Sequence, residues 1–114
     1  MKRIIDMATF HQLCNIACAF PDVTQEAHFE KISFRIKGKI FCTYDPNTTS
    51  STVKLSQLQQ EAYTNSSPHI EPVPNKWGHQ GWTHADTTKI DIGMLKKLLH
   101  DAYTLVAAKP IRKK

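Results

Sequence analysis

Residues 32–45, ISFRIKGKIFCTYD, decide the fold, because they hold two strand patterns with a turn signal between them. Ile32, Phe34 and Ile36 alternate with polar residues, which is the period-two pattern of a half-buried strand. Gly38 supplies the turn, since a residue without Cβ adopts positive φ without a steric clash. The chain then returns as a second strand over residues 40–44, so the stretch predicts a β-hairpin.

Four further segments are expected downstream of this hairpin. A turn signal at Asp45–Pro46–Asn47 leads into a third strand around residues 52–55. Ser56 and Gln59 have the spacing of a capping box, which predicts a short helix after Ser56. Residues 66–75, SSPHIEPVPN, contain three prolines and suit an edge strand or loop. Residues 81–87, GWTHADT, alternate and predict another strand.

Helices are expected at both ends of this β-rich region. Apolar residues recur at three- and four-residue steps over residues 4–20, and Pro21 ends the pattern. Residues 21–31 then read as a loop. Asp91 caps a last helix that Pro110 ends, with Lys96 and Lys97 facing outward. Its apolar stripe comprises Ile92, Leu95, Leu98, Leu99, Ala102, Leu105 and Val106.

The expected order of elements is α-β-β-β-α-β-β-α. Short links between consecutive strands favour an antiparallel sheet, here of about five strands. The helices would pack on one face of that sheet, which gives an α+β fold. The length of 114 residues indicates a single domain, which we place at residues 1–108.

The net charge of +5 is concentrated in a basic tail at residues 109–114, KPIRKK. Without that tail the chain has eleven basic and ten acidic residues, a net charge of +1. The overall charge therefore overstates the case for a nucleic-acid-binding body. A local exception is KISFRIKGK, which holds Lys31, Arg35, Lys37 and Lys39 and no acid.

Composition bounds the class of protein. No apolar run approaches the roughly 20 residues that cross a bilayer, and the basic start lacks the apolar core of a signal peptide. The three cysteines suit reduced thiols, so we expect a cytoplasmic protein with no membrane contact. Cys14 and Cys18 would share one helical face, where buried small side chains are favoured over a soft-metal pair.

Four landmarks recur in an order that resembles a known family: CAFPDVTQEAHF, FRIKGKIFCTYD, GWTHADTT and DAYTLVAAKPIRKK. The chain resembles the MmcQ/YjbR-like proteins, small bacterial proteins with a fold like that of CyaY. The resemblance spans nearly the whole chain. It implies DNA binding through paired β elements similar to a double wing, and it supplies no catalytic motif. Iron binding as in frataxin-type proteins is not implied, because acids are sparse in the first helix and its loop.

The stretch NKWGHQGWTHAD at residues 75–86 concentrates two tryptophans, two glycines and two histidines. In the family this region is a turn that leads into a strand holding a tryptophan. We therefore expect Trp82 in the core beneath the helices, and Gly78 and Gly81 in turn geometry. Trp77 suits either stacking on a base or a cap over the sheet edge.

Motifs for metal and enzyme chemistry are missing. His79 and His84 are five apart, with no C-x-x-C or H-E-x-x-H motif, so we expect no metal and no cofactor. Cys42 could pair with a histidine as a nucleophile, but its strand pattern places it with Ile40 and Tyr44 in the core. No phosphate-binding glycine loop or nucleophile elbow occurs. We expect a non-enzymatic protein and a monomer.

The candidate site is the basic hairpin, with DNA as the expected partner. Its contacts to phosphates would come from Arg35, Lys37, Lys39, Lys54, Lys76 and Trp77, with the tail adding non-specific attraction. Two alternatives stay open. The cations could be a solvated surface, and the sheet face could instead bind a protein or small ligand.

Overall fold

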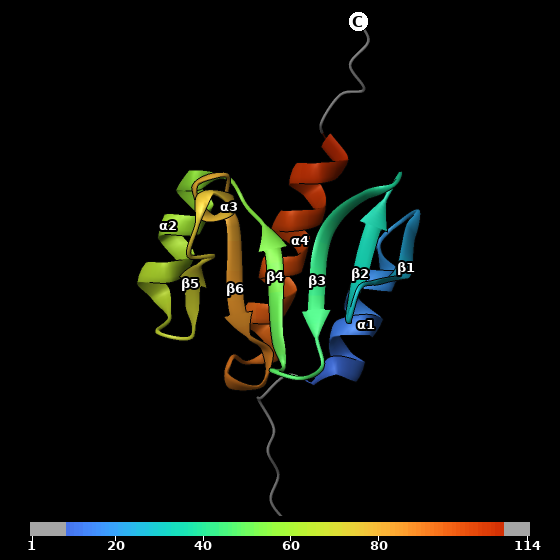
Figure 1. The fold of residues 1–114 in the computed structure, drawn as a ribbon, viewed down its shortest axis with the longest axis horizontal. Helices are drawn as coiled ribbons and strands as arrows, with labels where there is room; N and C mark the ends of the chain where they lie inside the picture. Colours follow the sequence, from blue (N-terminus) through green and yellow to red (C-terminus); the bar gives the residue numbers. More distant parts are fainter. Residues whose placement is uncertain (1–8, 109–114) are drawn as a thin grey trace, which may run out of the picture.

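The computed structural model describes residues 9–108 (Figure 1). Its elements are α1 (Phe10–Ala19), β1 (Val23–His28), β2 (Lys31–Ile36), β3 (Lys39–Asp45), β4 (Ser50–Lys54), α2 (Gln57–Ser66), β5 (Ile70–Pro72), α3 (Lys76–His79), β6 (Trp82–Asp86), the 3-10 helix η1 (Thr87–Lys89) and α4 (Ile92–Ala108). The basic tail at residues 109–114 and residues 4–8 of the expected first helix lie outside this range.

The strands form one antiparallel sheet in the order β1-β2-β3-β4-β6-β5. Helices α1 and α4 cover one side of it, and Figure 1 looks onto the other side, with α4 behind β3 and β4. We call this uncovered side, which carries Thr43, Thr52 and His84, the open face. The predicted α+β class with helices on one face is confirmed.

The core lies between the sheet and the helices α1 and α4. Large fully buried side chains include Phe34, Phe41, Leu13, Leu55, Leu95, Leu98, Leu99 and Val53. Most of the expected stripe of α4 is buried, while Ile92 and Leu105 are half-buried. Each fully buried leucine or phenylalanine contributes about 1.5–3 kcal/mol by leaving water.

The hairpin of β2 and β3 forms as predicted, with its turn at Lys37 and Gly38. Both residues have positive φ, 55° and 82°, which is the mark of a type I′ turn. The right-handed twist of such a turn matches the twist of the strands that it joins.

Strand β1 was expected as a loop, and that expectation is wrong. It pairs with β2 from Val23 opposite Ile36 to His28 opposite Lys31. As the edge strand it is exposed along Thr24–Ala27, so it lacks the alternation that reveals a half-buried strand. The sheet therefore has six strands where about five were expected.

A β-bulge in β3 overturns the expected facing of Ile40. Phe34 pairs with Cys42 and Arg35 with Ile40, so Phe41 is the extra residue. Phe41 and Cys42 are both fully buried on the helix side, whereas Ile40 lies on the open face. The predicted burial of Cys42 with Tyr44 is confirmed.

The helix starts follow their capping residues. The Thr9 side chain accepts from the Gln12 backbone N–H, so α1 begins at Phe10. The capping box of Ser56 and Gln59 is confirmed in α2. The Asp91 carboxylate accepts from the Met94 N–H at 2.8 Å, as predicted for α4.

The two cysteines of α1 differ in their surroundings. Cys14 is half-buried, whereas Cys18 is exposed near the end of the helix. The predicted burial of Cys18 is wrong, because the buried stripe of α1 passes through Leu13 and Ala17.

Candidate functional site

A row of six polar residues, one from each strand, crosses the sheet at one level. Direct register pairs link Glu26, Ser33, Thr43, Thr52, His84 and Glu71 in that order, and we call them the polar row. At its centre, Thr52 Oγ1 and His84 Nδ1 are 2.9 Å apart. The middle of the open face is therefore uncharged and able to hydrogen-bond, with a carboxylate at each end.

Trp82 lies on the open face, which corrects its expected place in the core. Along β6, Thr83 and Ala85 are fully buried on the helix side, so the strand turns Trp82 and His84 the other way. Thr83 is buried with its hydroxyl bonded to the Gly81 carbonyl at 2.9 Å. The space beneath the sheet at this point takes a small side chain rather than an indole.

Trp82 and Trp77 line the same hollow on the open face. The hollow has a volume of about 400 Å³. Its lining comprises His28, Lys31, Ile40, Thr43, Thr52, Val73, Trp77, Trp82 and His84. Trp77 is 50% exposed, an unusual amount for an indole in a small domain. The hollow thus combines aromatic walls with hydroxyl, imidazole and ammonium groups, as binding sites commonly do.

The glycines of the same stretch hold α3, and with it Trp77, against the sheet. A Cβ on Gly78 would lie 1.9 Å from the Val73 carbonyl oxygen, and one on Gly81 would lie 1.8 Å from that of Leu55. Gly81 also has a φ of +101°. The short helix α3 was expected as a turn, and Asn75 caps it through the Trp77 N–H.

Each indole of the hollow has a lysine ammonium beside it. Lys54 Nζ lies 5.9 Å from the ring centroid of Trp82, and Lys76 Nζ lies 6.0 Å from that of Trp77. Lys54 also donates a hydrogen bond to the Gln80 carbonyl. Of the expected site residues, the structure therefore brings together Lys54, Lys76 and Trp77.

The other expected contacts lie apart from this group. Arg35 Nε donates to Ser33 Oγ at 3.0 Å and is 3.7 Å from a Glu26 carboxylate oxygen. Its side chain is only 23% exposed. Lys37 lies in the turn, and Lys39 pairs with Ile36, whose side chain is buried on the helix side. Lys39 thus leaves its strand on the side opposite to the open face.

The surroundings of His84 favour the neutral form of its imidazole. Burial lowers the pKa of His84, and the nearby Lys31 ammonium lowers it further, while Glu71 opposes them. A neutral ring presents one donor and one acceptor nitrogen. His84 can therefore bond Thr52 through Nδ1 and still present Nε2 to the hollow.

Two features bear on the Cys42 thiol and on metal binding. Cys42 is fully buried, and burial raises the pKa of its thiol, so the nucleophilic thiolate is suppressed. Within residues 9–108, no group of three or more His, Cys, Asp or Glu side chains comes together as a metal site requires. No helix in that range could cross a membrane.

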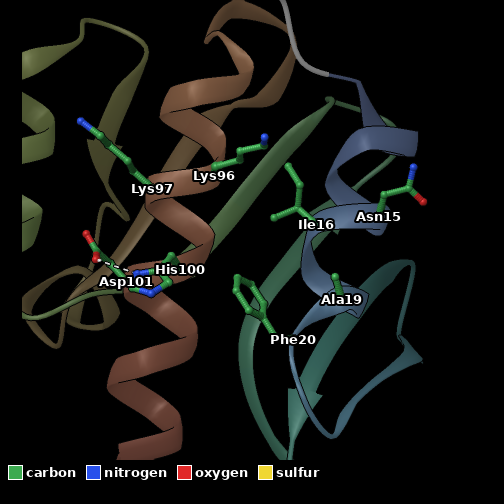
Figure 2. A pocket seen from close by; sticks show the side chains of 8 residues that line it. All are labelled: Asn15, Ile16, Ala19, Phe20, Lys96, Lys97, His100 and Asp101. Carbon is green, nitrogen blue, oxygen red and sulfur yellow. Dashed lines mark ion pairs between the residues drawn. The ribbon is translucent and has the colours of Figure 1, made fainter.

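A second hollow lies between α1 and α4, on the helix side. It has a volume of about 610 Å³, and in Figure 2 Ile16 of α1 and Phe20, the residue that follows α1, point into it. Across from them, α4 contributes Lys96 and His100. The floor of this groove is apolar, Asn15 and Lys97 point away from it in Figure 2, and His100 is paired with Asp101, so the open face is the better candidate site.

The chain is similar to known proteins in both sequence and structure. The family model described as YjbR matches residues 18–105, which is more than half of the chain. The chain is also similar in structure to the Deinococcus radiodurans protein DR2400, which has the domain DUF419. The TM-score is 0.78 at 22% identity, over 94% of this chain and 84% of that one, which shows a shared fold. No curated protein matches the chain. The chain belongs to the YjbR family.

Proposed function

We propose that the protein binds DNA without catalysing a reaction, and that it does so with the open face of its sheet. The observation that carries this proposal is the pairing of two indoles in one hollow, each with a lysine ammonium about 6 Å from its ring. Aromatic side chains stack on bases, and ammonium groups attract phosphates, so the arrangement suits both parts of a nucleotide.

The charges of the open face support a defined path for the phosphates. Lys54 and Lys76 stand at the end of the sheet where β4 stops and β6 begins. Asp45, Asp86 and Glu71 line hollows toward the other end. Lys31 lines one of these hollows together with Asp45 and offsets part of its charge, so a phosphate backbone is attracted more strongly to the first end than to the second.

The basic hairpin has a smaller part in this proposal than its sequence suggests. The guanidinium of Arg35 is paired with Glu26, so a phosphate would have to displace that carboxylate. Lys37 and Lys39 are exposed at the tip and add long-range attraction, which salt screens.

The test is fluorescence anisotropy with a labelled DNA that carries both a duplex stem and a single-stranded overhang. We expect Lys54→Ala with Lys76→Ala to weaken binding and to lower the slope of log affinity against log salt by about 1.5 to 2. The matched control is Lys96→Ala with Lys97→Ala, which removes the same charge from α4 on the helix side. An equal loss in both pairs would indicate general charge attraction and contradict the proposed site.

A chain that ends at Ala108 tests the basic tail, since no described element extends beyond that residue. The proposal requires that this shortened chain still binds the DNA. If it does not bind even at low salt, the open face is not a DNA site.

The second candidate is a small-ligand module that uses the same hollow. Its volume of about 400 Å³ falls within the range of roughly 300–1,000 Å³ that is usual for ligand pockets. In that case a small aromatic ligand would bind the hollow, and the affinity for DNA would be the same in the lysine variants as in the unchanged protein.

A further inference from the structure

We infer that the hollow on the open face accepts one unpaired base, so that the protein prefers single-stranded DNA to duplex DNA. This inference rests on the proposed function, that the open face binds DNA. It adds the form of DNA that the site selects.

The aromatic walls are the first argument. Trp77 and Trp82 lie in a concave lining, where a flat ring can be inserted but a rod-like duplex cannot follow. In a duplex both faces of each base are covered by its neighbours, so an indole stacks on it only after the base leaves the helix. A single strand exposes its base faces at little cost.

The polar lining is the second argument. Thr43, Thr52 and His84 stand at neighbouring positions of the polar row, and all three line the hollow. Hydroxyls donate and accept hydrogen bonds, and a neutral imidazole does so with its two nitrogens. These groups match the edge of an unpaired base, which a duplex uses for its own base pair.

The cations are the third argument. Lys54 and Lys76 do not line the hollow themselves, but their ammonium groups lie 5.9 and 6.0 Å from the ring centroids of the two indoles that do. A base stacked on either ring would hold its own phosphate within reach of that ammonium group. The distance between each indole and its lysine thus suits one nucleotide, with the base on the ring and the phosphate near the ammonium group.

The test uses the protein's own fluorescence, because the chain has two tryptophans and both line the hollow. A base stacked on an indole quenches its emission. The probes are a single strand about ten nucleotides long, the duplex of the same sequence, and a deoxynucleoside monophosphate. We expect the single strand to quench the fluorescence. We also expect the protein to bind the single strand at least tenfold more tightly than the duplex.

Variants assign the effect to the hollow. Trp82→Ala is expected to weaken single-strand binding by about 5- to 150-fold, while Trp82→Phe retains most of it by keeping an aromatic face. Leu58→Ala is the matched control, since Leu58 is a 75% exposed apolar residue on α2, away from the lining. If Trp82→Ala impairs folding, the quenching of the unmodified protein still decides the question.

The remaining outcomes separate this inference from the proposed function. Equal affinity for strand and duplex without quenching would overturn the inference and leave phosphate binding by the open face in place. Binding of the monophosphate as tightly as the strand would overturn the proposed DNA binding in favour of the small-ligand candidate, since the rest of the strand would then add nothing. If neither DNA binds, the proposed function fails as well.

Discussion

His84 sits at the centre of the open face, and its surroundings make the fold sensitive to acid. Burial and then Lys31 lower the pKa of His84 from its ordinary value of 6.5. Below pH 6.5 His84 takes up a proton more readily in the unfolded chain than in the folded chain. The free energy of unfolding therefore falls as the pH drops from 6.5 toward the lower pKa of the folded state. Above that range, both states are neutral at this position and the effect vanishes.

Replacing His84 with glutamine is expected to reduce this acid-side loss of stability. The check is the urea unfolding midpoint at about pH 7.5 and about pH 5.5, on either side of the usual histidine pKa. The exposed His79, replaced in the same way, is the control. An identical pH dependence in the His84→Gln variant and the unchanged protein would contradict the prediction.

Gly81 and Gly38 both have positive φ, yet they are expected to tolerate alanine very differently. A Cβ on Gly38 meets nothing within 4 Å, so Gly38→Ala should cost about 1–2 kcal/mol for the conformation alone. A Cβ on Gly81 overlaps the Leu55 carbonyl, so Gly81→Ala should cost about 3 kcal/mol or more. Urea denaturation measures both, and equal costs would contradict the overlap.

At the scale of elements, the starts of α2 and α4 could be predicted, because they depend on a few neighbouring residues. The capping box of Ser56 and Gln59 and the cap at Asp91 are such local signals. Strand β1 could not be predicted, because an edge strand is defined by its pairing with β2 and not by burial. The bulge at Phe41 interrupts the alternation of buried and open-face side chains along β3. It could not be predicted either, because it depends on the packing beneath the sheet.

Helix α2 has no fully buried residue, so its cap should matter more than usual. Gln60 and Tyr63 tie it to the rest of the molecule by hydrogen bonds, the latter to Asp101 at 2.6 Å. Ser56→Ala is expected to cost about 1 kcal/mol and to speed hydrogen exchange across α2. Ser66→Ala, at the last residue of α2, is the control, and the prediction fails if both changes have the same effect.

At the scale of the whole molecule, the sequence predicts the fold class better than the site. The hydrophobic pattern of α4 and of the hairpin is enough to place the helices on one face. The site depends on which side of β6 is covered. A signal was present, since the polar Thr52 and Lys54 flank the apolar Val53 in β4 and pair with His84 and Trp82. That pairing joins residues far apart in the sequence, so the facing of Trp82 could not be read from its own strand.

Cys42 is expected to report on unfolding of the entire domain. It is fully buried beneath the sheet, whereas Cys18 is exposed. In a chain with Cys14→Ser and Cys18→Ser, thiol labelling of Cys42 should be slow in buffer and should rise with urea in parallel with global unfolding. Rapid labelling of Cys42 without denaturant would mean that the sheet opens locally. The unmodified chain is the control, because Cys18 should react at once.

The lining of the open-face hollow comes from residues 28 to 84, on strands that pair only when the whole sheet is complete. The unfolded chain therefore contains no version of this cavity, and a molecule that enters it shifts the folding equilibrium by mass action. At a free concentration one hundred times the dissociation constant, the shift is about 2.7 kcal/mol. Thermal denaturation thus serves as a search tool, since any compound that raises the melting temperature is a candidate occupant, whatever its chemistry.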